Sequence, residues 1–378
     1  MSAIRLPKID SLMREIAGIS LAGDIGYSAG MLAQMMRLPS STRAQTVVSA
    51  RCVVLMLRLA HPNSADSAMR VLAAVLCLVC LGGPVAQAQA ENPLYLLQSD
   101  IVYGRKDGLA LTLDIFAPRA GGNQRGLLFC VSAGWFSAHQ SINSQFFFEF
   151  LRRGYTVFAV VHGSQPKYTI PEIICDMHRA VRFVRHHAGK FGVDPNRLGI
   201  FGGSAGGHLS LMQATHGLSG QADATDLVER QSSFVQAAAC FFPPTDFLNH
   251  GQPGENALGR GVLNNFRAPF DFRELDTRVN VFVPITDEHR VLEVGRQISP
   301  VYHVTPDDAP VFIVHGDADK LVPLQQAQRM VEVCREAKVP CELVIKPDAA
   351  HGWPDLSKDL VLFADWFDRH LLPSKPNL

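Results

Sequence analysis

The stretch that decides the fold of this chain runs from Asp194 to Thr215 and reads DPNRLGIFGGSAGGHLSLMQAT. Its apolar part, 198–201, predicts a short strand, and 208–215 predicts a helix. Between them lies the motif G-x-S-x-G, which in a strand–turn–helix setting places a serine hydroxyl at the top of a sheet. We therefore predict that Ser204 is a nucleophile. The alternative is a glycine-rich turn whose serine has no chemical role.

Strand and helix patterns alternate on both sides of this motif from Leu94 onward, which favours an α/β fold with a mostly parallel sheet. Continuous apolar runs predict buried strands, and Lys106-Asp107-Gly108 predicts a hairpin turn at the sheet edge. The expected strands are 101–105, 109–116, 126–132, 155–161, 198–201, 235–242, 310–314 and 341–346, and the expected helices are 146–153, 171–187, 208–215, 325–337 and 356–371.

The alternation lapses between Pro243 and Pro300, a segment too long for a plain connection. It is rich in glycine, proline and phenylalanine, the last at positions 247, 266, 270, 272 and 282. We interpret it as a small cap inserted over the site, within a single catalytic domain spanning 91–378. The phenylalanines would form either an apolar acyl pocket or simple packing contacts.

A serine hydroxyl needs a base, and this kind of fold places the partners in the order serine, acid, histidine. His351 lies in a loop between the last predicted strand and the last predicted helix, at the sheet edge where such sites form. His315 precedes the acid loop and would break the order, and His208 lies one turn into the helix after Ser204, where a packing role is expected. His351 is therefore the predicted base.

The acid is expected in the loop after strand 310–314, which reads HGDADKLVP from position 315. Asp319 is favoured because it lies further round the turn, where it can orient the imidazole. Asp317 is then expected to hydrogen-bond local backbone. Asp246, after strand 235–242, is a third candidate.

The reaction of such a serine also requires N–H donors for a developing oxyanion. We expect one from Ala205, and others from Ala133 and Gly134 in the loop Val131–Trp135.

Together these residues resemble the α/β-hydrolase superfamily, in the esterase and lipase branch that includes feruloyl or acetyl-xylan esterase-like and hormone-sensitive-lipase-like enzymes. The resemblance covers roughly residues 97–372 and rests on DPNR leading to GGSAGG at 202–207, on HGDADKLVP at 315–323 and on AHGW at 350–353. It implies Ser204 as nucleophile, Asp319 as acid and His351 as base. Two departures occur: the oxyanion loop reads VSAGW where the family has HGGGW, and His162-Gly163 stands where relatives often have Tyr-Arg.

The charge composition limits the classes of molecule that this protein is expected to bind. Lysine plus arginine and aspartate plus glutamate both number 35, so the formal charge is zero and no electrostatic argument favours nucleic acid or an anionic membrane. We expect a small-molecule or carbohydrate-linked ester substrate, and neither a metal nor an organic cofactor.

The N-terminal 90 residues carry a different signal. Residues 69–90 combine a positive start, an apolar run at 71–81 and small residues of the A-x-A type, the pattern of a secretory signal peptide. The run is too short to span a bilayer; the alternative is a buried helix. Residues 1–68 show no motif, and we expect a poorly ordered extension or an artefact of the gene start. Use of the signal would make the protein secreted or periplasmic.

Eight cysteines give no zinc-ligand spacing. Cys130, Cys175 and Cys240 are expected to be inert core thiols. Cys334 and Cys341 are candidates for a disulfide in an oxidising compartment.

The predicted function is a serine carboxylic-ester hydrolase that forms an acyl-enzyme. One rival is a prolyl-oligopeptidase-like serine peptidase, although the N-terminal 90 residues cannot supply the propeller domain that such enzymes carry. The other rival is a non-catalytic binding protein on a hydrolase scaffold.

Overall fold

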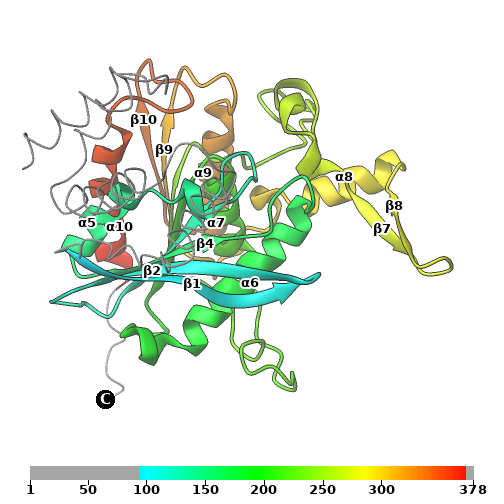
Figure 1. Cartoon of the computed structure of the whole chain (residues 1–378). Helices are drawn as coiled ribbons and strands as arrows, with labels where there is room; N and C mark the ends of the chain where they lie inside the picture. The colour runs from blue at the N-terminus through cyan, green and yellow to red at the C-terminus, as the bar shows by residue number, and fades with distance from the viewer. Residues whose placement is uncertain (1–93, 372–378) are drawn as a thin grey trace, which may run out of the picture. The chain divides into compact units, whose positions relative to one another are not determined.

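The computed structural model describes residues 94–371, which are built around one eight-stranded sheet (Figure 1). The strands lie in the order β1-β2-β4-β3-β5-β6-β9-β10. Their bounds are β1 Tyr95–Lys106, β2 Leu109–Pro118, β3 Gly126–Val131, β4 Thr156–Val161, β5 Leu198–Gly203, β6 Ala237–Phe241, β9 Val311–Gly316 and β10 Cys341–Lys346.

Strands β4, β3, β5, β6, β9 and β10 run parallel to one another. Strand β2 of the β1–β2 edge hairpin is antiparallel to both of its neighbours, β1 and β4. This confirms the predicted mostly parallel sheet with an edge hairpin. The largest difference is at β1, which begins at Tyr95 rather than at Ile101 and contains register shifts that its irregular apolar pattern did not reveal.

Helices cover both faces of the sheet. One face packs against α6 (Ile170–His186), α7 (Ala205–Thr215) and α9 (Gln325–Ala337), whose apolar side chains share one core that includes Met177, Leu209 and Met330. The other face packs against α5 (Phe148–Arg152) and α10 (Leu360–His370), with Phe150 and Phe367 in a second core. This two-sided cover explains why the central strands are apolar throughout.

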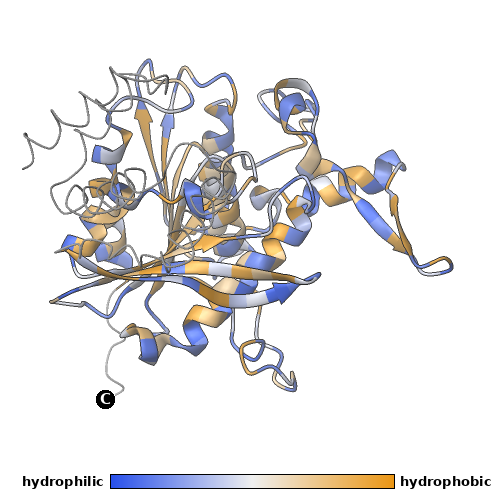
Figure 2. Ribbon diagram, in the orientation of Figure 1, coloured by the Kyte–Doolittle hydropathy of each residue, from blue (hydrophilic) through white to orange (hydrophobic). Residues whose placement is uncertain are grey.

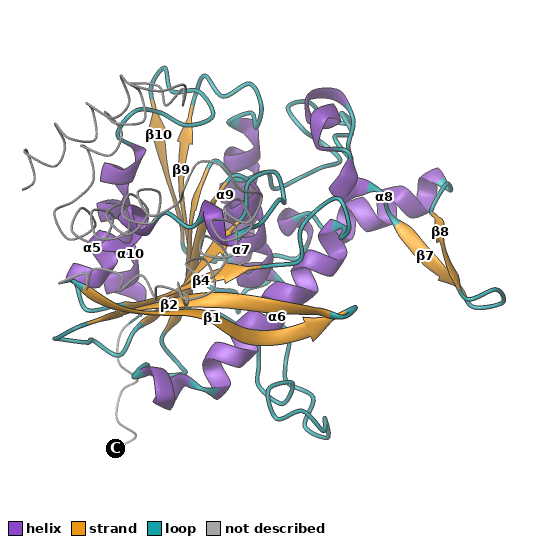
Figure 3. Ribbon diagram, viewed as in Figure 1, coloured by secondary structure: helices purple, strands orange, loops and turns teal. Residues whose placement is uncertain are grey.

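The segment 243–300 contains structure that the sequence did not predict. It holds the small hairpin of β7 (Arg273–Asp276) and β8 (Val281–Pro284), followed by α8 (Glu288–Gln297), joined by long loops (Figure 3). The hairpin projects away from the main sheet (Figure 1). Because β7 reads RELD, it has no apolar alternation that would indicate a strand.

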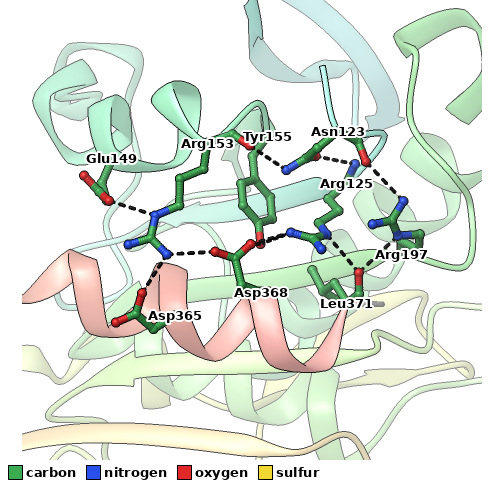
Figure 4. A network of polar contacts seen from close by, with 9 residues as sticks. All are labelled: Asn123, Arg125, Glu149, Arg153, Tyr155, Arg197, Asp365, Asp368 and Leu371. Carbon is green, nitrogen blue, oxygen red and sulfur yellow. Dashed lines mark hydrogen bonds and ion pairs between the residues drawn. The ribbon is translucent and has the colours of Figure 1, made fainter. Parts of the chain in front are cut away.

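A network of arginines fastens the last helix to the end of the sheet opposite the Ser204 turn (Figure 4). The Nε atoms of Arg125 and Arg197 both donate to the carbonyl oxygen of Leu371, at 2.9 and 3.1 Å. The carboxylate of Asp368 accepts from Tyr155 at 2.7 Å and from Arg153 at 2.8 Å, and it also pairs with Arg125. The network joins the starts of β3, β4 and β5 to the C-terminal end of α10.

The predicted extension 1–68 and signal segment 69–90 lie outside the described residues. Within 94–371, no helix is long and apolar enough to cross a membrane. Cys130 and Cys240 are buried as predicted, but Cys175 is exposed, so the prediction of a core thiol there was wrong: it lies on the side of α6 that faces a surface groove beside β1. Cys334 and Cys341 are free thiols, so the candidate disulfide is not formed in this structure.

Candidate active site

Ser204 occupies the sharp turn between β5 and α7. Its backbone lies at φ 54° and ψ −120°, a strained conformation for a residue with a side chain. The turn is possible because two glycines let backbones approach closely: a Cβ on Gly202 would lie 2.6 Å from the backbone of Gly206, and one on Gly206 would lie 2.7 Å from the carbonyl oxygen of Cys130. The strained turn lifts the hydroxyl above the carboxyl end of the sheet, as the motif predicted.

The structure brings Ser204, His351 and Asp319 together in one chain of hydrogen bonds. The distance from His351 Nε2 to Ser204 Oγ is 2.9 Å, and that from His351 Nδ1 to Asp319 Oδ2 is 2.7 Å. Because an ionised carboxylate only accepts, Nδ1 carries the proton, and Nε2 is left to accept from the serine hydroxyl. The imidazole is thus held in the tautomer that can remove the serine proton.

Asp319 is buried and fixed by its own loop. One of its oxygens accepts from the backbone N–H groups of Leu321 and Val322, each at 2.9 Å. Burial by itself raises the pKa of the Asp319 carboxyl, but hydrogen bonds from His315, His351 and Val322 outweigh it and hold the pKa well below its ordinary value. The carboxylate therefore stays ionised beside the imidazole.

The other acid candidates are placed elsewhere. Asp317 accepts from the backbone N–H of Asp348 at 2.7 Å, so it bonds the loop that precedes His351 rather than its own turn as expected. Asp246 accepts from Leu248 and Asn249 within its own loop, and from the hydroxyl of Tyr302.

The oxyanion loop forms a tight turn that corrects one prediction. The N–H of Ala133 donates to the carbonyl oxygen of Phe136 at 2.9 Å, and Phe136 donates back, with Gly134 and Trp135 at φ 55° and 61°. Ala133 was therefore the wrong choice of donor, because the turn already uses its N–H. Within residues 94–371, no acceptor is found for the N–H groups of Gly134 and Ala205.

His208 has the packing role that was expected of it. The ring is fully buried, with Nδ1 accepting from Trp135 Nε1 at 3.2 Å and Nε2 donating to the carbonyl oxygen of Ile298 at 2.7 Å. Burial lowers its pKa to about 4, so the neutral ring is the stable form. His208 thus ties the oxyanion loop to the inserted segment.

Two further side chains support the site: Phe242, which the sequence analysis did not single out, and His315, which it considered only as a candidate base. The ring of Phe242, at the end of β6 with φ 36°, lies 4.4 Å from the ring of His351 by their centroids. His315 is buried, donates from Nε2 to the carbonyl oxygen of Val322 at 2.8 Å, and lies 3.6 Å from Asp319. Only the position of Phe242 at a strand end beside the site could have indicated it from the sequence. His162, by contrast, is buried at the end of β4 and packs there.

One group of side chains resembles a metal site. In the described part of the chain, ligating atoms of Asp100, Asp114 and His139 lie within 4.8 Å of one another. They already bond among themselves and to Thr112, whose hydroxyl is 2.6 Å from His139 Nε2. Asp100 and Asp114 lie on the β1–β2 hairpin and His139 in the turn after β3, so the group includes none of Ser204, Asp319 and His351.

Comparison with known proteins agrees with this geometry. The family model BD-FAE matches residues 113–333, more than half of the chain. The chain belongs to the BD-FAE family. The matched region contains Ser204 and Asp319, and His351 follows it.

Curated relatives of this BD-FAE chain include three proteins of Mycobacterium tuberculosis. The probable carboxylic ester hydrolase LipM is 31% identical over 201 residues, covering 53% of this chain and 42% of LipM. Esterase LipC is 29% identical, covering 60% and 52%, and esterase LipQ is 26% identical, covering 73% and 60%. The chain spans about half the length of the curated relatives it matches.

Solved structures share the fold. A truncated carbohydrate esterase from gut microbiota superimposes with a TM-score of 0.58 at 22% identity, covering 74% of this chain and 98% of that one. The acetyl ester-xyloside bifunctional hydrolase of Caldicellulosiruptor lactoaceticus gives 0.58 at 22% identity, covering 72% and 96%. Esterase 2 of Thermogutta terrifontis, phosphoramylated by tabun, gives 0.55 at 24%, covering 76% and 100%. These neighbours establish the α/β-hydrolase fold.

Proposed function

We propose that this chain is a serine carboxylic-ester hydrolase in which Ser204 is the nucleophile, His351 the general base and Asp319 the orienting acid. The proposal rests on one observation above all: His351 Nε2 lies 2.9 Å from Ser204 Oγ, while Nδ1 of the same ring lies 2.7 Å from a buried carboxylate. The names of the curated relatives support ester hydrolysis as the reaction.

In the proposed mechanism, His351 removes the hydroxyl proton of Ser204 as its oxygen attacks the ester carbonyl. The ionised Asp319 stabilises the imidazolium that forms, and the imidazolium then protonates the departing alcohol. Water, activated by the same imidazole, releases the acid from the acyl-enzyme. Developing negative charge on the carbonyl oxygen would be met by the N–H groups of Gly134 and Ala205, the latter at the start of α7, where the helix dipole also favours an anion.

The test is covalent labelling together with turnover. A fluorophosphonate probe should label the wild-type protein, and Ser204→Ala should abolish labelling and lower kcat for p-nitrophenyl acetate by at least about 10⁴-fold. Ser210→Ala is a matched control, because Ser210 lies on the helix that follows Ser204 and, among residues 94–371, hydrogen-bonds Cys130 and the backbone of Gly206. A well-folded wild-type protein that stays unlabelled would leave only the binding-protein alternative.

Turnover of a peptide anilide in place of p-nitrophenyl acetate would instead favour the peptidase. Within the esters, we propose small-molecule or carbohydrate-linked substrates. We also propose export directed by residues 69–90, which N-terminal sequencing of protein from the culture fluid or periplasm would test.

A further inference from the structure

The turn that carries Gly134, a proposed oxyanion donor, holds an unusual residue at its second central position. The turn runs from Ala133 to Phe136, which exchange backbone hydrogen bonds. Its central residues, Gly134 and Trp135, both have positive φ, 55° and 61°. Turns of this kind favour glycine, asparagine or aspartate, because other side chains crowd their own backbone. A tryptophan keeps this conformation only where its surroundings hold it.

His208 supplies a directional contact to that tryptophan. Its Nδ1 accepts from Trp135 Nε1 at 3.2 Å, and its Nε2 donates to the carbonyl oxygen of Ile298 at 2.7 Å. An indole N–H can only donate and a carbonyl oxygen can only accept, so Ile298 fixes the tautomer in which Nδ1 is free to accept. Both nitrogens of the neutral imidazole are therefore used.

The surroundings of this polar ring would make it costly to bury without such bonds. His208 lies on α7, which packs on the sheet, and the central strands of the sheet are largely apolar (Figure 2). His208 is 0% exposed and Trp135 is 2% exposed, so water does not compete for the hydrogen bond that joins them. Polar groups that are fully paired within an apolar layer fix one arrangement of their partners.

The hydrogen bond between His208 and Trp135 joins the two elements that carry the proposed oxyanion donors. Trp135 directly follows Gly134 in the turn. His208 lies on the first turn of α7, the helix that begins at Ala205, and its backbone N–H donates to the carbonyl oxygen of Ser204 at 2.9 Å. The bond therefore sets how the Gly134 turn lies against the start of α7.

The inserted segment packs behind the same turn. A Cβ on Gly134 would lie 2.5 Å from the ring of Phe266, and the ring of Phe270 lies 5.3 Å from that of Trp135. These rings bring apolar surface against the turn, but apolar contacts have no preferred direction. The hydrogen bond to the imidazole is directional, so it fixes the orientation of the indole.

We propose that His208 is a positioning residue for the proposed reaction: it holds the turn so that the N–H groups of Gly134 and Ala205 converge on one carbonyl oxygen. This inference rests on the proposed ester hydrolysis. The role is indirect, because the imidazole acts through Trp135 on the residue before it. Donors stabilise an oxyanion only when they are placed about 3 Å from it, so a shift of the turn by about 1 Å lowers kcat more than it weakens substrate binding.

The test compares His208→Leu with the wild-type protein on p-nitrophenyl acetate. Leucine keeps an apolar side chain in the core but leaves the indole N–H of Trp135 without its acceptor. We expect kcat to fall about 10–100-fold, with KM within about threefold of the wild type. Labelling by a fluorophosphonate should slow by a similar factor, because its P=O oxygen needs the same donors. His208→Gln should regain most of the kcat, since an amide can both accept from Trp135 and donate to Ile298.

His178→Leu is the matched control. His178 is also a buried histidine, 3% exposed on α6, and its Nδ1 lies 2.9 Å from Ser233 Oγ. Its removal should lower the melting temperature as His208→Leu does, because each change leaves a buried partner unpaired, but it should leave kcat unchanged. Equal losses of kcat in the two variants would reduce His208 to a packing residue, and so would a wild-type kcat in a folded His208→Leu protein.

Trp135→Phe removes the same hydrogen bond from its other end, and it provides the test if His208→Leu does not fold. We expect a similar fall in kcat, and a double variant no slower than the slower single variant, because the two changes remove one interaction. A wild-type kcat in Trp135→Phe, or losses that multiply in the double variant, would overturn the positioning role alone. A wild-type protein that does not hydrolyse p-nitrophenyl acetate would contradict the proposed ester hydrolysis, and this role with it.

Discussion

At the scale of single residues, the roles proposed for the two neighbouring aspartates can be separated. Asp319→Asn keeps an oxygen that can accept from the N–H groups of Leu321 and Val322. Its NH₂ group, however, can donate a hydrogen bond to the ring, so the imidazole can adopt the wrong tautomer. We expect kcat for p-nitrophenyl acetate to fall by about 10³–10⁴-fold with little change in the melting temperature. Steady-state kinetics at pH 7 and thermal unfolding measure the two quantities.

Asp317→Asn provides the control for that measurement, because Asp317 bonds the backbone of Asp348, whereas the carboxylate bonded to His351 is that of Asp319. Its kcat should stay within about threefold of the wild type. Comparable losses in the two variants would mean that the loop as a whole, rather than the carboxylate of Asp319, supports activity.

Sequence reasoning located Ser204, His351 and Asp319 because each has a local signal: a motif, a strand end or a chain order. It failed for Ala133, where the turn Ala133–Phe136 consumes the N–H, and such a hydrogen bond depends on φ values that one sequence does not reveal. Phe242 was missed for another reason. Its contact with His351 joins residues 109 positions apart, and no local pattern marks it.

At the scale of the elements, three buried histidines make the stability of the packed strands and helices depend on pH. Burial lowers the pKa of His162, just after β4, and of His208 on α7 to about 4. It lowers the pKa of His178 on α6 to about 3, where the charges of His216 and Arg182 also act. In the unfolded chain each titrates near the ordinary value of about 6.5. The unfolded state therefore binds more protons as the pH falls below about 6.5, and stability is lost from there down to the folded pKa values.

We expect the free energy of unfolding to decrease from pH 7 to pH 5 by up to about 2 kcal/mol for each of these histidines. Urea unfolding at a series of pH values measures it. His178→Gln should flatten the dependence, whereas His289→Gln, at an exposed position on α8, should leave it unchanged. A stability that is level between pH 7 and pH 5 would contradict the prediction.

Helices and strands were predictable where the burial of one face gives the sequence a regular pattern of apolar residues. Helix α9 and strand β10 match their expected bounds, because each carries a complete apolar pattern ended by clear breakers. The β7–β8 hairpin was not predictable, because it packs little of its surface and its first strand is polar. A two-stranded ribbon of this kind depends on its surroundings rather than on its own sequence.

At the scale of the whole molecule, the arginine network around Asp368 and Leu371 fastens the C-terminal end of α10 to three strands (Figure 4). Asp368→Ala removes the shared partner of Arg153, Tyr155 and Arg125 and leaves their donors without it. We expect a loss of about 1–3 kcal/mol in the free energy of unfolding, with kcat unchanged because the network lies at the opposite end of the sheet from Ser204.

Asp365→Ala is the control for this variant. Asp365 pairs with Arg153 and its side chain is 56% exposed, so the cost should be at most about 1 kcal/mol. If the two substitutions destabilised the protein equally, the network would be no more than a set of surface ion pairs.

The arginine network also has a consequence for folding during translation. Arg125 and the Leu371 carbonyl are 246 positions apart, so their hydrogen bond can form only after translation has passed residue 371. His351 also emerges late, well after the serine and the aspartate it would serve. A nascent polypeptide that ends between residues 204 and 351 therefore holds the proposed nucleophile but neither the proposed base nor the Leu371 contact, and we expect such truncated products to be inactive and sensitive to proteases.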